Sequence, residues 1–320
     1  MIGKLKKNVL VSIIIAGIIY LAFTLYADYS KVLVAFTQFD WYLLLPLLVL
    51  SFLNYYTRFL KWDYYLSVIK VQMKKIDSLS IFMSGLIMSI TPGKIGELIK
   101  SYLVKEVTNE PISKTAPVIF AERVTDFLSL LIISIVGSYT FNYGITFSII
   151  VTVFFIILIF IISNKKLCLS LLTSLERLTI VKKYLVSIHN SYESSYQLLK
   201  PFPLLIMTIV SLIAWGFECL GYYLILINFN IEFGIFWASF SYAFAIIAGA
   251  VSLFPGGLGV TEGSLTFLLV NKGIPNSTAV ATTLLVRTVT LWFAVVVGIV
   301  SVFAYQKRFG KLNIESINNS

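Results

Sequence analysis

The chain has 320 residues and a formal net charge of +10, and 58% of its residues are hydrophobic while only 12% are charged. A soluble domain has about 25% charged residues, and apolar runs of about 20 residues, long enough to cross a bilayer core, recur here. The composition predicts an all-α polytopic membrane protein with one membrane domain over 1–320. It excludes a separate soluble catalytic domain, because the longest segment expected outside the membrane, 164–200, is too short for an independent core.

Two cysteines and one histidine limit the metal and redox chemistry that the chain could perform. Cys168 and Cys219 are far apart and show neither metal-site nor disulfide spacing, so we expect them to be small apolar fillers. His189 is the only histidine and is expected at the surface, which excludes a histidine-cluster metal site. We expect no metal ion and no cofactor.

The predicted elements begin with a retained N-terminal transmembrane helix at 9–27, which follows a basic head. About five further full crossings are predicted from apolar length, at 41–62, 116–140, 145–163, 202–228 and 278–304. Two other apolar regions, 76–104 and 233–271, are each interrupted by a Pro-Gly break, so they are broken crossings or re-entrant helix pairs. Segment 164–200 alternates basic and apolar residues at helical spacing, which is typical of an amphipathic segment on the cytoplasmic interface. A solvated linker is the alternative.

Lysine and arginine counts discriminate between these two interpretations of the interrupted regions. If both regions are re-entrant and the N-terminus is cytoplasmic, 20 of the 25 cations lie on the cytoplasmic side. They occupy segments 1–8, 58–75, 100–114, 164–200 and 305–320. A single crossing at 76–104 would instead export the six cations of 164–200. The bias favours two re-entrant pairs and cytoplasmic N- and C-termini. Basic loops facing an anionic leaflet account for the net charge without nucleic acid.

The second half of the chain repeats a pattern found in the first half. PGKIGE at 92–97 parallels PGGLGVTE at 255–262, and DYYLSVI at 63–69 parallels GYYLILI at 221–227. Each glutamate is followed by a further proline and then by an arginine, namely Pro111 and Arg123 in the first copy and Pro275 and Arg287 in the second. We therefore expect repeats at 38–140 and 199–305. Three crossings separate the breaks, so the copies would be inverted, an arrangement that places substrate sites near the midplane.

The two breaks predict a site for an anion. A break inside the bilayer needs protein or a wet cavity around it, and the half-helix that follows offers free N–H groups and the positive end of its dipole. The residues expected to bind an anionic head group are Arg123, Arg287, Lys94, Gly93, Gly96, Gly256, Gly257 and Gly259. A nucleotide loop is excluded, because GGLGVTEG fits neither the dinucleotide nor the P-loop pattern and follows no strand.

Carboxylates accompany these cations within the apolar segments. Those expected to pair with cations or to carry a coupling proton are Glu97, Glu262, Asp126, Glu122 and Glu218. Glu97 and Glu262 could instead cap their half-helices. Asp126 can pair with Arg123 on one helix face, whereas Arg287 needs Glu262 or a ligand. The arginines could bind phosphate, for which a guanidinium is well suited, or could tie half-helices together.

The motifs PGKIGE, AERVTD and PGGLGVTE, together with the arginine after Pro275, resemble the lysylphosphatidylglycerol synthase transmembrane, flippase-like family, also called the UPF0104 group. The resemblance covers nearly the whole chain. In full-length members this region is similar to a lipid flippase and precedes a soluble domain that transfers an aminoacyl group to phosphatidylglycerol. Only a short tail follows Ala304 here, so the resemblance implies a flippase-like protein without the C-terminal aminoacyltransferase domain.

The sequence predicts an integral membrane translocator that moves an anionic, phosphate-bearing lipid, such as an aminoacylated lipid or a polyprenyl phosphate, across the cytoplasmic membrane. Its expected partners are membrane lipids and an enzyme of envelope-lipid synthesis, not nucleic acid. Two alternatives stay open. One is a membrane-embedded lipid-modifying transferase of the phosphatidylglycerol lysyltransferase kind, although no nucleophile–base pair is visible. The other is an accessory protein of envelope-lipid synthesis.

Overall fold

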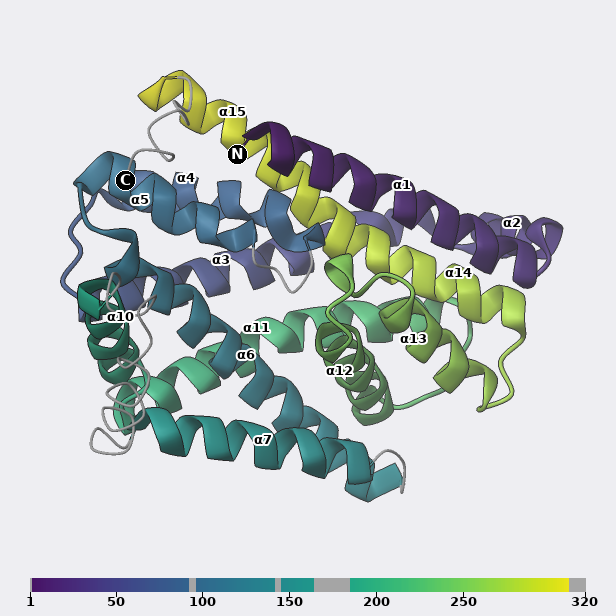
Figure 1. Cartoon of the computed structure of the whole chain (residues 1–320). Coiled ribbons are helices and arrows are strands. Elements are labelled where there is room, and N and C mark those ends of the chain that lie inside the picture. The colour runs from purple at the N-terminus through teal and green to yellow at the C-terminus, as the bar shows by residue number, and fades with distance from the viewer. Residues whose placement is uncertain (1, 92–95, 142–144, 164–184, 311–320) are drawn as a thin grey trace.

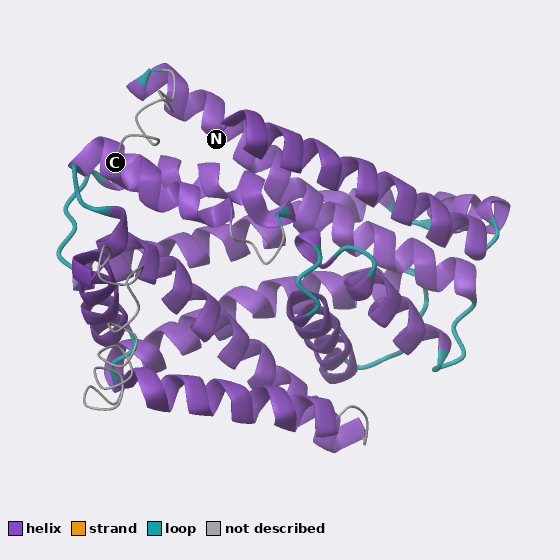
Figure 2. Cartoon of the chain, in the orientation of Figure 1, coloured by secondary structure: helices purple, strands orange, loops and turns teal. Residues whose placement is uncertain are grey.

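The computed structural model describes residues 2–91, 96–141, 145–163 and 185–310. Within these ranges every regular element is a helix and no strand is present, as Figure 1 and Figure 2 show. The all-α architecture predicted from composition is thereby confirmed. Among the described residues, three helices are long and apolar enough to cross a membrane, namely Trp41–Val68, Pro201–Asn228 and Asn276–Phe309. The count of about six crossings stays a prediction.

The N-terminal region differs from the sequence prediction. Helix α1 (Ile2–Tyr26) is followed directly by α2 (Tyr29–Gln38), and the two axes differ by 96°. Asp28 forms the corner with a φ of 68°, and its side chain accepts a hydrogen bond of 3.2 Å from the Ser30 N–H. The sequence predicts only a connecting segment at 28–40, because a ten-residue amphipathic stretch carries no long apolar run. The structure instead places α2 against α14.

The first half contains a helical hairpin that is interrupted at the predicted break. Its elements are η1 (Trp41–Leu43), α3 (Leu44–Val68), α4 (Lys75–Gly85), η2 (Leu86–Ile90), α5 (Ile99–Thr108) and α6 (Ile112–Phe141). Helices α4 and α5 lie against one another. The contact is close, because a Cβ at Gly85 would lie 2.6 Å from Cγ of Lys100. The chain therefore folds back at this break.

Two helices lie between the halves, α7 (Ile145–Ser163) and α10 (Leu185–Leu198), and both pack on α6 (Figure 1). The Ser191 hydroxyl on α10 donates a hydrogen bond of 2.9 Å to the carbonyl of Ser113. Helix α10 is the described part of the predicted amphipathic segment 164–200; the rest of that segment, with Cys168, lies outside the described residues. His189 is exposed, as predicted.

The second half repeats this order of elements. They are α11 (Pro201–Asn228), α12 (Ile235–Val251), η4 (Pro255–Gly257), α13 (Val260–Val270), α14 (Asn276–Arg287), the π-helical turn η5 (Thr288–Trp292) and α15 (Phe293–Phe309). The chain reverses at its glycines, because Gly256, Gly257 and Gly259 have φ values of 60°, 68° and 83°, which other residues rarely adopt. Cys219 is buried on α11.

The halves meet along α3 and α11 and at the tips of the two breaks. Asn54 Nδ2 donates a hydrogen bond of 2.8 Å to the carbonyl of Ala214, and Leu47 packs near Gly221, so α3 and α11 run antiparallel. At the tips, a small apolar group joins η2, η4, η5, α15 and α1. We call it the junction cluster; its buried members are Ala16, Ile90, Leu258, Leu291 and Val295.

Candidate functional site

A cavity of about 590 Å³ lies where the two halves meet. Both breaks reach its wall, the first through Ser89 and Thr91 and the second through Gly256 and Gly257. Five charged side chains also line it, namely Arg58, Arg123, Asp126, Glu218 and Arg287. Most of the remaining wall is apolar and comes largely from α6, α7 and α12. The cavity therefore has a charged part and an extended apolar part.

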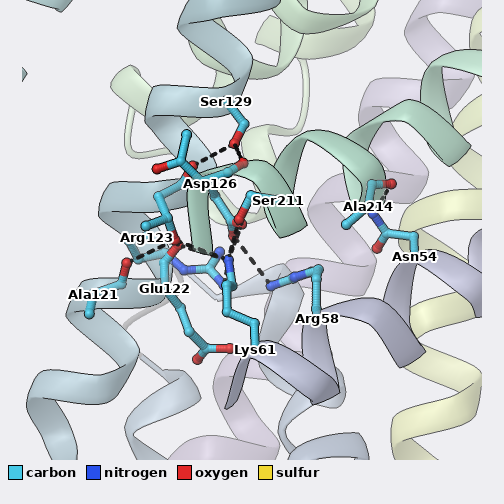
Figure 3. Close-up of polar contacts among 12 residues, drawn as sticks. Asn54, Arg58, Lys61, Ala121, Glu122, Arg123, Asp126, Ser129, Ser211 and Ala214 are labelled. Carbon is cyan, nitrogen blue, oxygen red and sulfur yellow. Dashed lines mark hydrogen bonds and ion pairs between the residues drawn. The ribbon is translucent and has the colours of Figure 1, made fainter. Parts of the chain in front are cut away.

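Seven charged side chains from α3, α5, α6 and the end of the first break pack together beside this cavity. Figure 3 labels five of them, namely Arg58, Lys61, Glu122, Arg123 and Asp126. We call them the charged cluster; its members are Arg58, Lys61, Glu97, Lys100, Glu122, Arg123 and Asp126. The Arg123 side chain is 20% exposed and the others at most 7%. Charges buried to this degree are tolerated only when they are paired and hydrogen-bonded.

The two lysines of the charged cluster are well paired. Lys61 Nζ lies 2.5 Å from Asp126 Oδ1 and 2.7 Å from the Ser211 hydroxyl on α11. Lys100 Nζ lies 2.6 Å from Glu122 Oε2 and 3.3 Å from Glu97 Oε2. Each lysine thus ties α6 to another helix of the first half, and Lys61 also reaches the second half.

The two arginines are held more loosely. Arg123 Nη2 lies 3.3 Å from Glu97 Oε2 and 3.4 Å from Asp126 Oδ2. Arg58 Nη2 lies 3.8 Å from the same Asp126 oxygen. The expected pairing of Arg123 with Asp126 is present. The charged cluster has four cations for three carboxylates, so it carries a formal positive charge at the cavity wall.

In the second half, Glu262 both caps its half-helix and pairs with a cation, the two roles that the sequence left open. Its Oε2 accepts a 2.7 Å hydrogen bond from the Gly259 N–H at the start of α13, which is a cap, and its Oε1 lies 2.7 Å from Arg287 Nε. Arg287 Nη2 also donates to the carbonyl of Gly256 at 2.5 Å. The Tyr20 hydroxyl on α1 donates to Glu262 at 3.2 Å and accepts from Trp292 Nε1 at 3.0 Å.

The π-helical turn η5 begins directly after Arg287. Such turns leave backbone groups without their usual helical partners and often occur at functional sites. Here the carbonyl of Thr290 accepts a hydrogen bond of 2.5 Å from the hydroxyl of Tyr55 on α3. The turn thereby connects the arginine of the second half to the wall formed by the first half.

The other predicted site residues have the following places. Gly93 and Lys94 lie outside the described residues. The Gly96 N–H donates to the Thr91 hydroxyl at 3.1 Å, inside the first break. Glu218 accepts a hydrogen bond of 2.7 Å from the Tyr242 hydroxyl at the cavity wall. Arg123, Asp126, Glu218 and Arg287 thus come together around one cavity, with Glu97 and Glu122 directly behind the first two.

Three cations of the site are not among the predicted site residues. The sequence assigns Arg58, Lys61 and Lys100 to the cytoplasmic side, but the structure buries them to 6%, 0% and 2% exposure. The reason is that their carboxylate partners Glu122 and Asp126 come from α6, later in the chain. A signal existed, since Arg58 and Lys61 are three residues apart and therefore share a face of an apolar helix.

The arrangement can bind an anion that carries an apolar group. Guanidinium groups recognise phosphate and carboxylate oxygens, and the apolar wall suits hydrocarbon. Within the part of the chain that the structure describes, no group of three or more His, Cys, Asp or Glu side chains is placed to hold a metal ion.

Comparisons with known proteins identify the family of this chain. A family model described as the lysylphosphatidylglycerol synthase TM region matches residues 9–298. A UPF0104 membrane protein of Methanocaldococcus jannaschii is 29% identical over 234 residues, which span 70% of this chain and 95% of the relative. Another, of Pyrococcus horikoshii, is 23% identical over 278 residues, 77% of this chain and 82% of the relative. The family-model match spans both breaks and every charged residue of the cavity, and the chain belongs to the membrane-embedded family of lysylphosphatidylglycerol synthase transmembrane regions.

Proposed function

We propose that the protein is a translocator of anionic, phosphate-bearing lipids in the cytoplasmic membrane. The observation that carries the proposal is the cavity of about 590 Å³, which combines three arginines and the tips of both breaks with a largely apolar wall. The head group of a lipid needs the arginines and the tips of the breaks, and its acyl chains need the apolar wall. An aminoacylated lipid and a polyprenyl phosphate both fit this description.

We also propose that residues 38–140 and 199–305 are inverted repeats. A residue with left-handed backbone geometry follows the end of α3 and also the end of α11. These residues are Lys70, with a φ of 57°, and Asn230, with a φ of 55°, and they are 160 positions apart in the sequence. The same offset relates Asn54 to Ala214, which contact one another across the antiparallel pair. Contact between equivalent positions is expected where a two-fold axis passes through the membrane plane. This offset of 160 residues is two residues larger than the offset between DYYLSVI at 63–69 and GYYLILI at 221–227.

The matched charge pairs give independent support to the repeat. Glu97 pairs with Arg123 at 3.3 Å, and Glu262 pairs with Arg287 at 2.7 Å. In both copies the glutamate follows the break and the arginine comes from the next long helix. The arms of each break contact one another, which favours re-entrant pairs. Their entry from opposite faces is part of the proposed inversion.

The proposed topology has six crossings, formed by α1, α3, α6, α7, α11 and the continuous α14–α15 unit, with both termini in the cytoplasm. Burial of Arg58, Lys61 and Lys100 removes three cations from the cytoplasmic count. The cytoplasmic side still has more cations than the opposite side, which has only Lys31 and Lys272. Rocking of one repeat against the other would then expose the cavity to each side in turn. The carboxylates beside the arginines would hold the cations in place or carry a coupling proton.

Filling the cavity tests the proposed function. Ala250 on α12 lines the cavity, whereas Ala248 on the same helix does not. We expect Ala250→Trp to abolish transfer of acyl-labelled phosphatidylglycerol between leaflets of reconstituted liposomes, because the indole occupies space that the lipid needs. Ala248→Trp should retain transfer. Equal transfer by the two variants, or no transfer by the unmodified protein with any anionic lipid, would contradict the proposal.

The same preparation separates translocation from the alternatives. Purified protein given an aminoacyl or glycosyl donor and a lipid acceptor should form no product if it only translocates. Product formation would instead support a lipid-modifying transferase. An accessory role in envelope-lipid synthesis would show as transfer that appears only when a co-purifying enzyme is present.

A further inference from the structure

Three buried hydrogen-bond donors on residues that line the cavity have no acceptor among the described residues. They are Arg58 Nε, Arg123 Nε and Trp215 Nε1. Arg58 is 6% exposed and Trp215 is 5% exposed. Buried donors in native proteins nearly always have a partner, so an unpaired one points to a missing water or ligand. Three such donors on residues around one cavity point to a ligand with several acceptor oxygens, which these side chains would rotate to meet because the donor atoms have almost no accessible surface in this structure.

Arg58 differs in this respect from Arg287. Arg287 already uses Nε for Glu262 and Nη2 for the carbonyl of Gly256, at 2.7 and 2.5 Å. For Arg58, the paired oxygen is Asp126 Oδ2, at 3.8 Å, which is beyond hydrogen-bond distance. The other Asp126 oxygen is taken by Lys61 and Ser211, at 2.5 and 3.1 Å. Asp126 thus keeps the guanidinium charged and in place but leaves its donors unused.

The three donors come from helices that converge. Arg58 and Arg123 approach the same Asp126 oxygen, at 3.8 and 3.4 Å, so their guanidinium groups are neighbours. Trp215 is four residues after Ser211, one turn along the face of α11 that contacts Asp126. Figure 3 shows Arg58, Arg123, Asp126 and Ser211 grouped at this meeting of α3, α6 and α11.

We propose that Arg58, Arg123 and Trp215 form an oxyanion subsite that binds the phosphate of a phospholipid. The guanidinium groups supply charge and paired donors, and the indole N–H supplies a neutral donor. The apolar wall from α7, including Phe154 and Phe155, continues from this subsite and receives the acyl chains. The assignment of a lipid, as opposed to free phosphate, rests on the proposed function; the subsite itself rests on the unpaired donors.

Binding measurements on the purified full-length protein in phospholipid-free detergent test the subsite. The probes are short-chain phosphatidylglycerol, diacylglycerol with the same chains, and glycerol phosphate, which separate the contributions of phosphate and tails. Hydrogen bonds to a charged group correspond to about a 10- to 100-fold change in affinity. We therefore expect Trp215→Phe to weaken phosphatidylglycerol binding about tenfold and Arg58→Gln by at least that much. Diacylglycerol binding should be unaffected.

The chain offers a matched control. Trp62 is also buried and its Nε1 also has no acceptor, but it does not line the cavity. Trp62→Phe should leave phosphatidylglycerol binding unchanged. If Arg58→Gln does not fold, Trp215→Phe still decides, because phenylalanine keeps an aromatic ring in place. Equal weakening by Trp62→Phe and Trp215→Phe, or no weakening by either, would overturn the subsite.

Two outcomes separate this proposal from the proposed function. Transfer of lipid by the unmodified protein, with normal binding in Trp215→Phe and Arg58→Gln, removes the subsite and keeps the translocator. Weakened binding in those variants, without any transfer by the unmodified protein, keeps the subsite and removes the translocator. Glycerol phosphate binding as tightly as phosphatidylglycerol would overturn the lipid assignment.

Discussion

Glu262 shows how one buried side chain can stabilise a break in a membrane helix. Its two oxygens satisfy a backbone N–H at the start of α13 and a guanidinium on α14, both at 2.7 Å. Arg287 in turn satisfies the carbonyl of Gly256 inside the break. Backbone groups freed by the break therefore have charged partners, as a low-dielectric environment requires.

Loss of Arg287 should be costly because it leaves this carboxylate buried without its cation. We expect Arg287→Met to destabilise the protein by about 3–5 kcal/mol, the usual penalty for breaking a buried pair. Adding Glu262→Gln should restore part of the loss, since a neutral amide can still accept from Gly259. The stability of both variants is measured by thermal unfolding in detergent, with size-exclusion chromatography as the readout. A double variant no more stable than the single one would contradict this account.

At the scale of elements, the second hairpin depends on a close approach of its arms. Gly249 of α12 faces Thr261 of α13, and a Cβ at Gly249 would lie 2.0 Å from the threonine hydroxyl and 3.3 Å from Cα of Gly257. No rotamer change removes the second contact, because it is with backbone. The arms therefore pack this closely because residue 249 is a glycine, which has no Cβ.

Gly249→Ala should destabilise the protein by at least about 1–3 kcal/mol, the range for overpacked sites. Gly216→Ala on α11 is the control, because nothing lies within 4 Å of the added Cβ. At that exposed position of a helix, alanine should stabilise the protein by about 0.5–1 kcal/mol. Midpoints of thermal unfolding compare the two, and equal midpoints would show that the arms do not need this glycine.

The elements also show what the sequence could predict. Long apolar runs correctly predicted α3, α11 and the α14–α15 unit, and the Pro-Gly motif correctly placed the second break at η4, because proline and glycine act locally. Helix α2 was missed, since ten residues give too weak a periodic signal. The contact of Tyr20 with Glu262 could not be predicted either, because it joins residues far apart in the chain and comes from a helix outside both proposed repeats.

At the scale of the whole molecule, the proposed inversion makes a prediction about sidedness. Gln72 and Glu232 are equivalent and exposed residues in the connections after α3 and α11. We expect Gln72→Cys to react with a membrane-impermeant maleimide only from the cytoplasmic side, and Glu232→Cys only from the outside. The background has Cys168 and Cys219 replaced by alanine. Labelling of both cysteines from one side of sealed vesicles would contradict the inverted topology.

The charged cluster shows why the whole site was only partly predictable. Collinear motifs linked Arg123 to Arg287 and Glu97 to Glu262, because the proposed duplication would preserve spacing. The charges that break the symmetry have no such signal. Lys100 has Leu265 at the corresponding place, three residues after the glutamate. The shared helix face of Arg58 and Lys61 is a weak signal, because basic residues at a membrane interface show the same spacing. Only packing against α6 reveals their role.

The junction cluster places aliphatic side chains between the tips of the two breaks. Ile90, Leu258 and Leu291 meet between the tips of the breaks, and apolar constrictions exclude water and ions. Replacing Leu258 and Leu291 together by serine should raise the proton and sodium leak of reconstituted liposomes, read with internal dyes. Leu60→Ser, on an exposed face of α3, should not. We therefore expect a few aliphatic side chains to insulate the two faces of the membrane electrically, so that the buried charges of this protein do not dissipate the membrane voltage.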